Sequence, residues 1–305
     1  MTLLLPLELV EAIIDYLVEP SYQYLDNDTS SSLKAVSLVC RAFVAPSQSR
    51  LFATITLRSP PHSLQCVECR LLEVYIISTH RQLKSTIAAF SRLTAASPHL
   101  LGYVRRLNLY GSPHPLSRLS PPASHTEWLS SQSHHLTTFI PNLTPRLSGF
   151  GLYNADWKEL SSEVLDAINS ILESSRLESL HLEETTNIPI PVLASCGHLQ
   201  HLTLLMVEGH ASTVRPPNTW DDSALTWGPA MNHQKSQLIS LKLFAQDSII
   251  DWFSMEKCLF DISHLRHLVL LRGGHDLTKF FQTCSKSLES FEMEGWSNSL
   301  RLFIS

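Results

Sequence analysis

The sequence predicts an α/β protein in which three short N-terminal helices precede a solenoid built around a parallel sheet. Helical periodicity dominates residues 5–57, and from residue 58 onward the hexad Leu-x-x-Leu-x-Leu recurs. Leu fills 51 of the 305 positions, a frequency at which about 1.4 strict hexads arise by chance. Four strict hexads lie between residues 177 and 270, so the repeat is a real feature of the chain.

The helical part is expected to contain three short helices. The first begins at Pro6, whose missing N–H costs nothing in a first turn, and ends near Pro20. Its apolar face repeats at helical spacing: Val10, Ile13, Ile14 and Leu17. Residues 19–32 are polar and rich in turn-forming residues, so we expect a loop there. A second helix is predicted from Leu33 to about Arg41, and a third from near Pro46 to Leu51.

The repeated part is expected to alternate helices and strands. Strand segments are predicted to start at 104, 147, 177, 199, 238, 265 and 288, with the alternate leucines on one side. Each gap of 22 or more residues is long enough for the crossover that parallel neighbours require. Amphipathic helices are predicted before two of the strands, at 87–93 and 164–172.

Irregular spacing of these strands indicates two inserted loops, residues 111–146 and 207–237. Only 12 residues follow Met293, too few for another full repeat. We therefore expect the last edge of the sheet to lack a cap, as it would in a truncated gene product.

Composition excludes several classes of function. Ten glycines in 305 residues disfavour a Rossmann enzyme, and a net charge of -5 gives no general attraction to nucleic acid. The apolar start lacks the basic segment of a signal peptide, and charges interrupt every candidate membrane span. Six scattered cysteines fit a reducing compartment. We expect a soluble intracellular protein, in the cytoplasm or nucleus, with no membrane or nucleic-acid partner.

The N-terminal motifs resemble the F-box. They occur in the family's order: Leu5-Pro6-Leu7-Glu8-Leu9, Ile13-Ile14-Asp15-Tyr16-Leu17, residues 33–43 and Arg50-Leu51-Phe52. An F-box over 1–57 and a leucine-rich-repeat-like solenoid over 58–305 resemble F-box proteins common in fungi. The resemblance implies a non-enzymatic substrate receptor, which docks on a Skp-type adaptor in a cullin-based, SCF-type ubiquitin ligase and holds a client protein on the repeats.

The resemblance also implies which residues meet the adaptor. They match the family by residue type: Leu5, Pro6, Leu9, Leu38, Val39, Cys40 and Phe43. Elementary energetics agrees, because a unit of about 50 residues buries too little surface to be secure alone and should leave apolar side chains for a partner. An interaction scaffold unconnected with ubiquitination, with these helices as its N-terminal cap, is the alternative.

Residues between the repeated leucines should form the opposite face of the sheet, because side chains alternate along a strand. Tyr and Arg are common in interface hot spots, so we expect client contacts at Arg106, Tyr110, Tyr153 and Phe244. Arg106 and Lys242 lie in these rows, but the sequence shows no basic cluster.

The sequence offers weak candidates for a metal or catalytic site. Cys66 and Cys69 form one Cys-x-x-Cys pair without a second pair at zinc-finger spacing. Histidines near Leu199 and Leu265 are expected to be packing or surface residues, and Cys40, Cys196 and Cys284 to be small buried side chains. A hydrolase would need Ser, His and Asp in one geometry, yet the chain lacks a Gly-x-Ser-x-Gly elbow and a phosphate loop. We expect neither cofactor nor metal.

Overall fold

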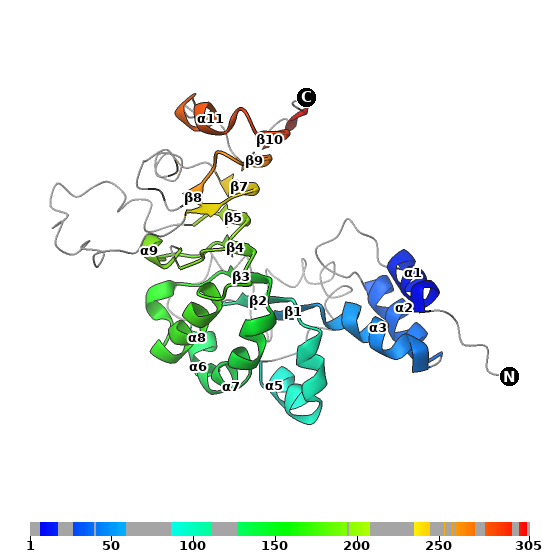
Figure 1. Ribbon diagram of the computed structural model, residues 1–305. Helices are drawn as coiled ribbons and strands as arrows, with labels where there is room; N and C mark the ends of the chain where they lie inside the picture. The colour runs from blue at the N-terminus through cyan, green and yellow to red at the C-terminus, as the bar shows by residue number, and fades with distance from the viewer. Residues whose placement is uncertain are drawn as a thin grey trace, which may run out of the picture.

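A long sheet with a helical unit at one end forms the framework of the computed structural model (Figure 1). The structure describes residues 7–17, 27–39, 41–58, 87–111, 127–193, 195–207, 235–244, 253, 258, 260–271, 278–294 and 299–303. Eight strands run parallel in chain order, and a ninth closes the far edge antiparallel. The predicted α/β class, with N-terminal helices and a parallel sheet, is confirmed.

The helical unit contains α1 (Leu7–Leu17), α2 (Asn27–Ser37) and α3 (Arg41–Phe52). Two of its boundaries differ from the prediction. The second helix begins in the polar stretch expected to be a loop, where Asn27, Asp28 and Thr29 are residue types that favour helix starts. The third begins at Arg41, and Pro46 lies inside it.

The helical unit has a small core of its own. Four buried side chains form it, Val10, Ile14, Leu33 and Phe43, with Val36 and Leu51 packed against them. An ion pair between Arg50 and Asp15 joins α3 to α1. These contacts hold three short helices together around few apolar residues.

All seven predicted strands are present, each beginning two residues after the predicted start. The strands that carry the expected repeats are β2 (Arg106–Tyr110), β3 (Gly149–Tyr153), β4 (Ser179–Glu183), β5 (His201–Leu205), β7 (Ser240–Phe244), β9 (His267–Leu271) and β10 (Ser290–Glu294). The first leucine of each strict hexad lies in the turn before its strand and is buried, as are the two leucines inside the strand. The predicted inward orientation of the leucines is confirmed.

Helices cover the leucine side of the sheet. They are α5 (Ile87–Ala96), α6 (Glu127–Ser131), α7 (Ser133–Leu143), α8 (Ser162–Leu172), α9 (Ile190–Leu193) and α11 (Thr278–Cys284), together with the 3-10 helices η2 (Pro98–Gly102), η4 (Thr144–Arg146) and η5 (Trp157–Glu159). Side chains such as Phe90, Phe139 and Ile168 pack with the hexad leucines in one continuous core. In Figure 1, α5, α7 and α8 lie along the first strands of the sheet.

The described part of one predicted insertion, residues 127–146, is largely helical, which corrects for these residues the loop expected over 111–146. Leu136, Phe139, Ile140 and Leu143 repeat at i, i+3, i+4 and i+7, and all four are buried. The many Ser, Thr and His residues of this segment lie on the remaining sides of α7 and obscured that pattern. Most of the second predicted loop lies outside the described residues, which resume with β6 (Ser236–Gln237), paired with β8 (Phe260–Asp261).

Two strands at the ends of the sheet were not predicted. β1 (Thr54–Leu57) pairs with β2, so the sheet begins inside the segment assigned to the helical domain, and Leu57 belongs to the sheet core. β11 (Ser299–Phe303) pairs antiparallel with β10. β10 is therefore not the last strand of the sheet, because the chain returns as a hairpin instead of completing a helix-strand repeat.

The same turn follows three successive strands. The residue after each of β3, β4 and β5 has a left-handed backbone: Asn154 (φ 50°), Glu184 (φ 49°) and Met206 (φ 49°). The backbone N–H of Asn154 donates to the carbonyl of Glu183, and that of Glu184 to the carbonyl of Leu205. After β3 and β4 this turn continues the hydrogen-bonded ladder one residue past the strand, and the left-handed residue gives all three turns a common backbone geometry.

Candidate binding surfaces

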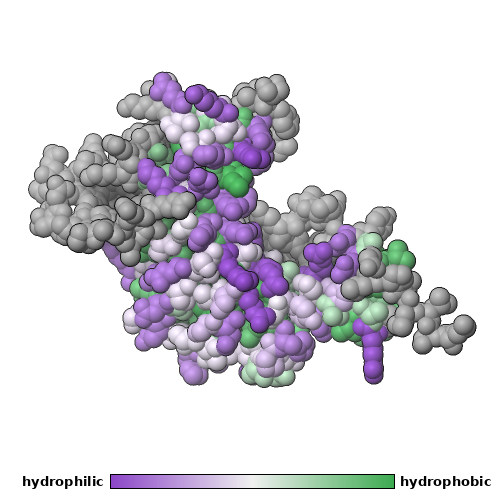
Figure 2. Space-filling view, in the orientation of Figure 1, coloured by the Kyte–Doolittle hydropathy of each residue, from purple (hydrophilic) through white to green (hydrophobic). Residues whose placement is uncertain are grey.

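Exposed apolar side chains gather on the helical unit. Among the described residues, four of the five exposed large hydrophobic side chains belong to it: Leu9 (52% exposed), Ile13 (42%), Leu38 (86%) and Val39 (73%). We call these four residues the exposed apolar set. Figure 2 shows hydrophobic surface at the outer end of this unit.

Local structure explains why these side chains face outward. On α1, Val10 and Ile14 point to the core, so Leu9 and Ile13, each one residue earlier, form a second i, i+4 pair on an adjoining face. Leu38 and Val39 lie in the turn after α2, where their N–H groups donate to the carbonyls of Ala35 and Val36. Neither pair has a place in the helical core.

The expected adaptor residues therefore have different environments. Leu9, Leu38 and Val39 are exposed, as a contact with a second protein requires. Phe43 is 6% exposed and belongs to the helical core, so its side chain supports the surface instead of lining it. Leu5, Pro6 and Cys40 lie outside the described residues. Sequence reasoning placed Ile13 on the apolar face of the first helix and did not name it as an adaptor contact; its pairing with Leu9 at helical spacing was the available signal.

The second surface is the side of the sheet opposite the helices, which we call the open face. Along β4, β5, β7 and β9, leucines alternate with partly or fully exposed residues, as predicted. The first residues of the strands align in register as a strand-start ladder: Arg106, Gly149, Ser179, His201, Ser240, His267 and Ser290. Their last residues form a strand-end ladder: Tyr110, Tyr153, Glu183, Leu205, Phe244, Leu271 and Glu294.

Stacked rings occupy the strand-end ladder at its β2 end. The Tyr110 and Tyr153 rings lie 4.3 Å apart and nearly parallel, and the Arg58 guanidinium lies 4.0 Å from the centre of the Tyr110 ring. The His181 ring lies 4.8 Å from that of Tyr153, and its Nε2 is 3.0 Å from Oε2 of Glu183. These contacts join four neighbouring strands or strand ends through their side chains.

This packing changes the expectation for Tyr153. The side chain is 3% exposed because neighbouring rings enclose it, so it shapes the open face without offering a client much surface. Gly151 makes room for the arrangement, since a Cβ there would lie 2.5 Å from Oδ1 of Asn108 and 2.6 Å from the Tyr153 ring. Tyr110 and Phe244 are half-buried and remain on the open face.

Arg106 reaches further across the sheet than its position on β2 suggests. Its Nη2 donates to Oγ of Ser179 on β4 at 3.2 Å, passing over Gly149 on the strand between them. A Cβ on Gly149 would lie 2.9 Å from the Arg106 Nε. Glycine at this position therefore lets the guanidinium cross one strand.

The reach of Arg106 brings positive charge toward His201. Burial of the imidazole is the main cause that lowers the pKa of His201, and the charges of Arg106 and His267 lower it further. The Glu178 carboxylate acts in the opposite direction and raises the pKa. Two histidines expected to be packing or surface residues thus share the open face with Arg106.

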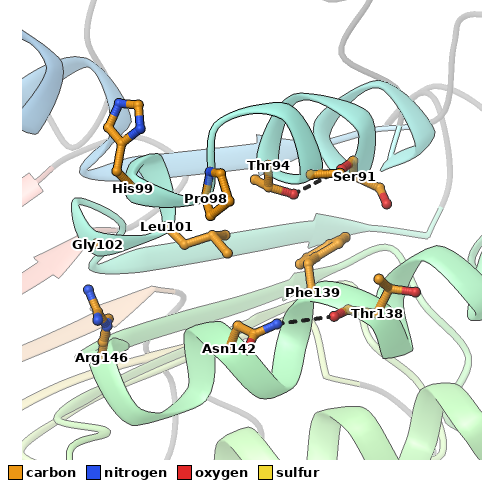
Figure 3. A pocket seen from close by; sticks show the side chains of 11 residues that line it. Ser91, Thr94, Pro98, His99, Leu101, Gly102, Thr138, Phe139, Asn142 and Arg146 are labelled. Carbon is orange, nitrogen blue, oxygen red and sulfur yellow. Dashed lines mark hydrogen bonds between the residues drawn. The ribbon is translucent and has the colours of Figure 1, made fainter.

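A pocket of about 400 Å³ lies on the helical side, between α5, η2 and α7. Figure 3 shows His99 and Arg146 at one end of it and Thr94, Thr138 and Asn142 along it. Thr94 Oγ1 donates to the carbonyl of Ser91, and Asn142 Nδ2 to that of Thr138. Because these polar groups bond within their own helices, they do not converge on a common point as groups that orient a small ligand do.

The cysteine and metal candidates have plain structural roles where they are described. Cys196 and Cys284 are buried, as expected, and burial raises the pKa of their thiols to about 12 and about 11. No group of three His, Cys, Asp or Glu side chains in the described part of the chain is placed to hold a metal ion. Cys66 and Cys69 lie outside the described residues.

Membrane association through a spanning helix was tested on the same residues. Among the helices that the structure describes, none has the length and apolar character needed to cross a bilayer.

Comparison with known proteins adds no further assignment. Neither a protein-family model nor a curated protein matches this chain. The exposed apolar set and the open face are the two candidate binding surfaces of this chain.

Proposed function

We propose that this protein is the substrate-recognition subunit of a cullin-based, SCF-type ubiquitin ligase. Its helical unit docks on a Skp-type adaptor, and the open face of the leucine-rich-repeat-like sheet holds a client protein. The observation that carries the proposal is the concentration of exposed apolar side chains on the helical unit. The F-box-like order of motifs in the same residues supports it.

The energetics of this surface favour association. Complete burial of one Leu, Ile or Val side chain contributes about 1.5–3 kcal/mol. Four side chains that are already 42–86% exposed can therefore contribute roughly 4–8 kcal/mol when a partner covers them. The loss of rigid-body freedom on association costs about 4–15 kcal/mol. Because this cost can equal or exceed the gain from the four side chains, a stable complex needs additional contacts.

The connection between the two surfaces suits a receptor. Only Ala53 separates the end of α3 from the start of β1, and its carbonyl accepts hydrogen bonds from the N–H groups of Arg105 (2.8 Å) and Arg106 (2.9 Å). The helical unit is thus tied directly to the first strands of the sheet. A short, bonded connection limits how far a client on the sheet can move relative to the adaptor.

The proposed mechanism is proximity: the chain holds a client near the ubiquitin-transfer machinery and carries out no chemical step itself. A client held at a fixed distance from the ubiquitin-transfer machinery presents its lysines at a high effective concentration, which speeds transfer. This role implies a cytoplasmic or nuclear location, to which six scattered cysteines are suited.

Capture of a purified Skp-type adaptor tests the proposal. We expect the wild-type chain to retain the adaptor, and a Leu9→Asp, Val39→Asp double variant to lose it, because each charge would be buried against an apolar partner. Leu93→Asp is the matched control: Leu93 lies on α5 and is 41% exposed, so this variant should retain the adaptor.

Circular dichroism would verify that all three variants fold. Failure of the wild-type chain to bind the adaptor would overturn the proposal in favour of an interaction scaffold outside ubiquitination. Equal adaptor retention by the double variant would show that docking does not use the exposed apolar set.

A further inference from the structure

The strand-start ladder carries basic side chains in a row, one guanidinium and two imidazoles. Arg106 places its guanidinium against Ser179 on β4, His201 follows on β5, and His267 follows on β9 after one intervening strand. Both histidines are exposed. The sequence alone separates these residues by as many as 161 positions, and the parallel register brings them to one edge of the open face.

The other members of this ladder are small and uncharged. Gly149, Ser179, Ser240 and Ser290 lie between or beside the basic groups, and Ser290 Oγ is 2.8 Å from Nδ1 of His267. The imidazoles and the guanidinium extend further from the sheet than these small side chains. The serine hydroxyl groups lie beside them. Such a row can accept several anionic groups and supply hydrogen bonds to them.

Two acidic groups of the open face lie away from the strand-start ladder, and a third, Glu178, lies beside it. Glu183 is at the strand end and is bound to His181, and Glu292 is at the middle of β10. Glu178 precedes β4 and is exposed; it is the carboxylate that acts on His201. Lys242, at the middle of β7, adds a positive group between the two ladders.

The spacing of the basic groups favours an occupant with several separated anionic groups over one compact anion. Adjacent strands lie about 4.8 Å apart, so Ser179 to His201 spans about 5 Å and His201 to His267 about 10 Å. An extended peptide advances about 3.3 Å per residue. Carboxylates on a peptide laid across the strands can therefore meet successive basic groups, whereas a single phosphate reaches one or two of them.

At β5, β7 and β9 the strand-end ladder is apolar. Leu205, Phe244 and Leu271 are the last residues of β5, β7 and β9, and each is partly exposed. The two ladders lie four residue steps apart along a strand, which is about 13 Å. An occupant that suits the whole face thus combines acidic groups on one side with apolar side chains on the other.

We propose that the open face binds an acidic segment of the client that also carries leucine-like side chains, with its carboxylates on Arg106, His201 and His267 and its apolar groups on Leu205, Phe244 and Leu271. This inference rests on the proposed function, since it names the chemistry of the client. Charge complementarity at the strand-start ladder selects the acidic occupant.

A defined probe can test this chemistry with the full-length chain. The probe is a fluorescein-labelled peptide of four Glu-Glu-Leu repeats, and its binding is measured by fluorescence anisotropy at pH 6 and pH 8. A Gln-Gln-Leu peptide of the same length tests the need for charge, and a peptide with phosphoserine at one position and Gln at the other acidic positions tests a compact anion. We expect the Glu-Glu-Leu peptide to bind most tightly and to weaken as salt is added.

Variants of the ladder locate the binding. Arg106→Gln should weaken binding of the acidic peptide about fivefold, and the His201→Gln, His267→Gln double variant should also weaken it at pH 6. Arg176→Gln is the control: it removes the same charge from an exposed residue in the turn before β4, outside both ladders, and should bind like the wild type.

Some outcomes would overturn the inference. Equal affinity for the Glu and Gln peptides, or unchanged affinity in the Arg106 and histidine variants, would reject the acidic client. Tighter binding of the phosphoserine peptide would replace it with a phosphorylated one.

Peptide binding and adaptor capture are separate measurements. The Leu9→Asp, Val39→Asp variant should bind the acidic peptide normally. Loss of peptide specificity with intact adaptor capture would therefore reject only the client chemistry, whereas absent adaptor capture would reject the proposed function.

Discussion

The helical unit and the sheet differ in how completely each buries its own apolar residues. The helical core has four fully enclosed side chains, and the same unit leaves the exposed apolar set uncovered. The sheet core joins every leucine of the strict hexads with the helices that cover them. Beyond the helical unit, Leu93 is the only exposed large hydrophobic side chain in the described part of the chain. The sheet buries its own apolar side chains, whereas the helical unit leaves apolar surface that a partner can cover.

This difference separates stability from recognition. A small unit buries a low fraction of its surface and gains from a partner, whereas a repeated sheet buries its leucines between neighbouring repeats. Substitutions in the sheet core should therefore change the free energy of unfolding, whereas substitutions in the exposed apolar set should change partner binding. Four predictions test this contrast, from the largest expected effect to the smallest.

The largest effect is expected in the sheet core. Leu268→Ala on β9 removes a fully buried side chain and should lower the free energy of unfolding by about 2–5 kcal/mol. Leu38→Ala, in the exposed apolar set, should change it by less than about 0.5 kcal/mol. Urea unfolding monitored by circular dichroism measures both. Similar losses from the two variants would contradict the division between a complete and an incomplete core.

A smaller loss is expected at Gly151 on the open face. Alanine there would press its Cβ against Asn108 and the Tyr153 ring, and should cost about 1–3 kcal/mol of unfolding free energy. Gly197→Ala is the control, because no atom lies within 4 Å of its new Cβ. If both variants unfold at the same urea concentration, the close packing of the stacked rings is not a source of stability.

The left-handed turn after β5 should permit a modest gain. Met206 adopts φ 49°, a conformation that Asn tolerates better and that Asn154 occupies after β3. Met206→Asn should raise the free energy of unfolding by about 0.5–1 kcal/mol, which thermal unfolding can detect. A lower midpoint temperature would mean that side-chain contacts of Met206 outweigh its backbone cost.

The smallest effect concerns pH. Burial, followed by the nearby charges of Arg106 and His267, lowers the pKa of His201 in the folded chain despite Glu178. The unfolded chain then binds more protons, so unfolding free energy should fall as pH drops through the ordinary histidine pKa of about 6.5. His201→Gln should flatten that part of the stability profile between pH 7 and pH 5. An unchanged slope would show that His201 is not the group responsible.

Sequence patterns predicted the repeated part of the fold well because leucine spacing reports directly on which residues face the core. The shared two-residue offset of the strands arises because the first leucine of each hexad closes the preceding turn. β1 and β11 lacked this signal: β1 follows a helix without a hexad, and β11 is added as a hairpin. Their pairing depends on tertiary contacts that a local pattern does not contain.

The candidate surfaces were predicted less completely, for two physical reasons. A helical motif identifies apolar residues but does not divide them between core and surface, so Phe43 was expected at the adaptor surface and Ile13 was not named there. The basic row on the open face depends on the register of distant strands and on Gly149, which lets Arg106 reach Ser179. No spacing along the chain reveals that juxtaposition.

Hydrogen–deuterium exchange of the chain with and without a purified Skp-type adaptor tests the central claim most directly. The account predicts slower exchange on adaptor binding in residues 7–17 and in the turn containing Leu38 and Val39, with the strands of the sheet unchanged. Protection confined to the open face, or no protection anywhere, would contradict it.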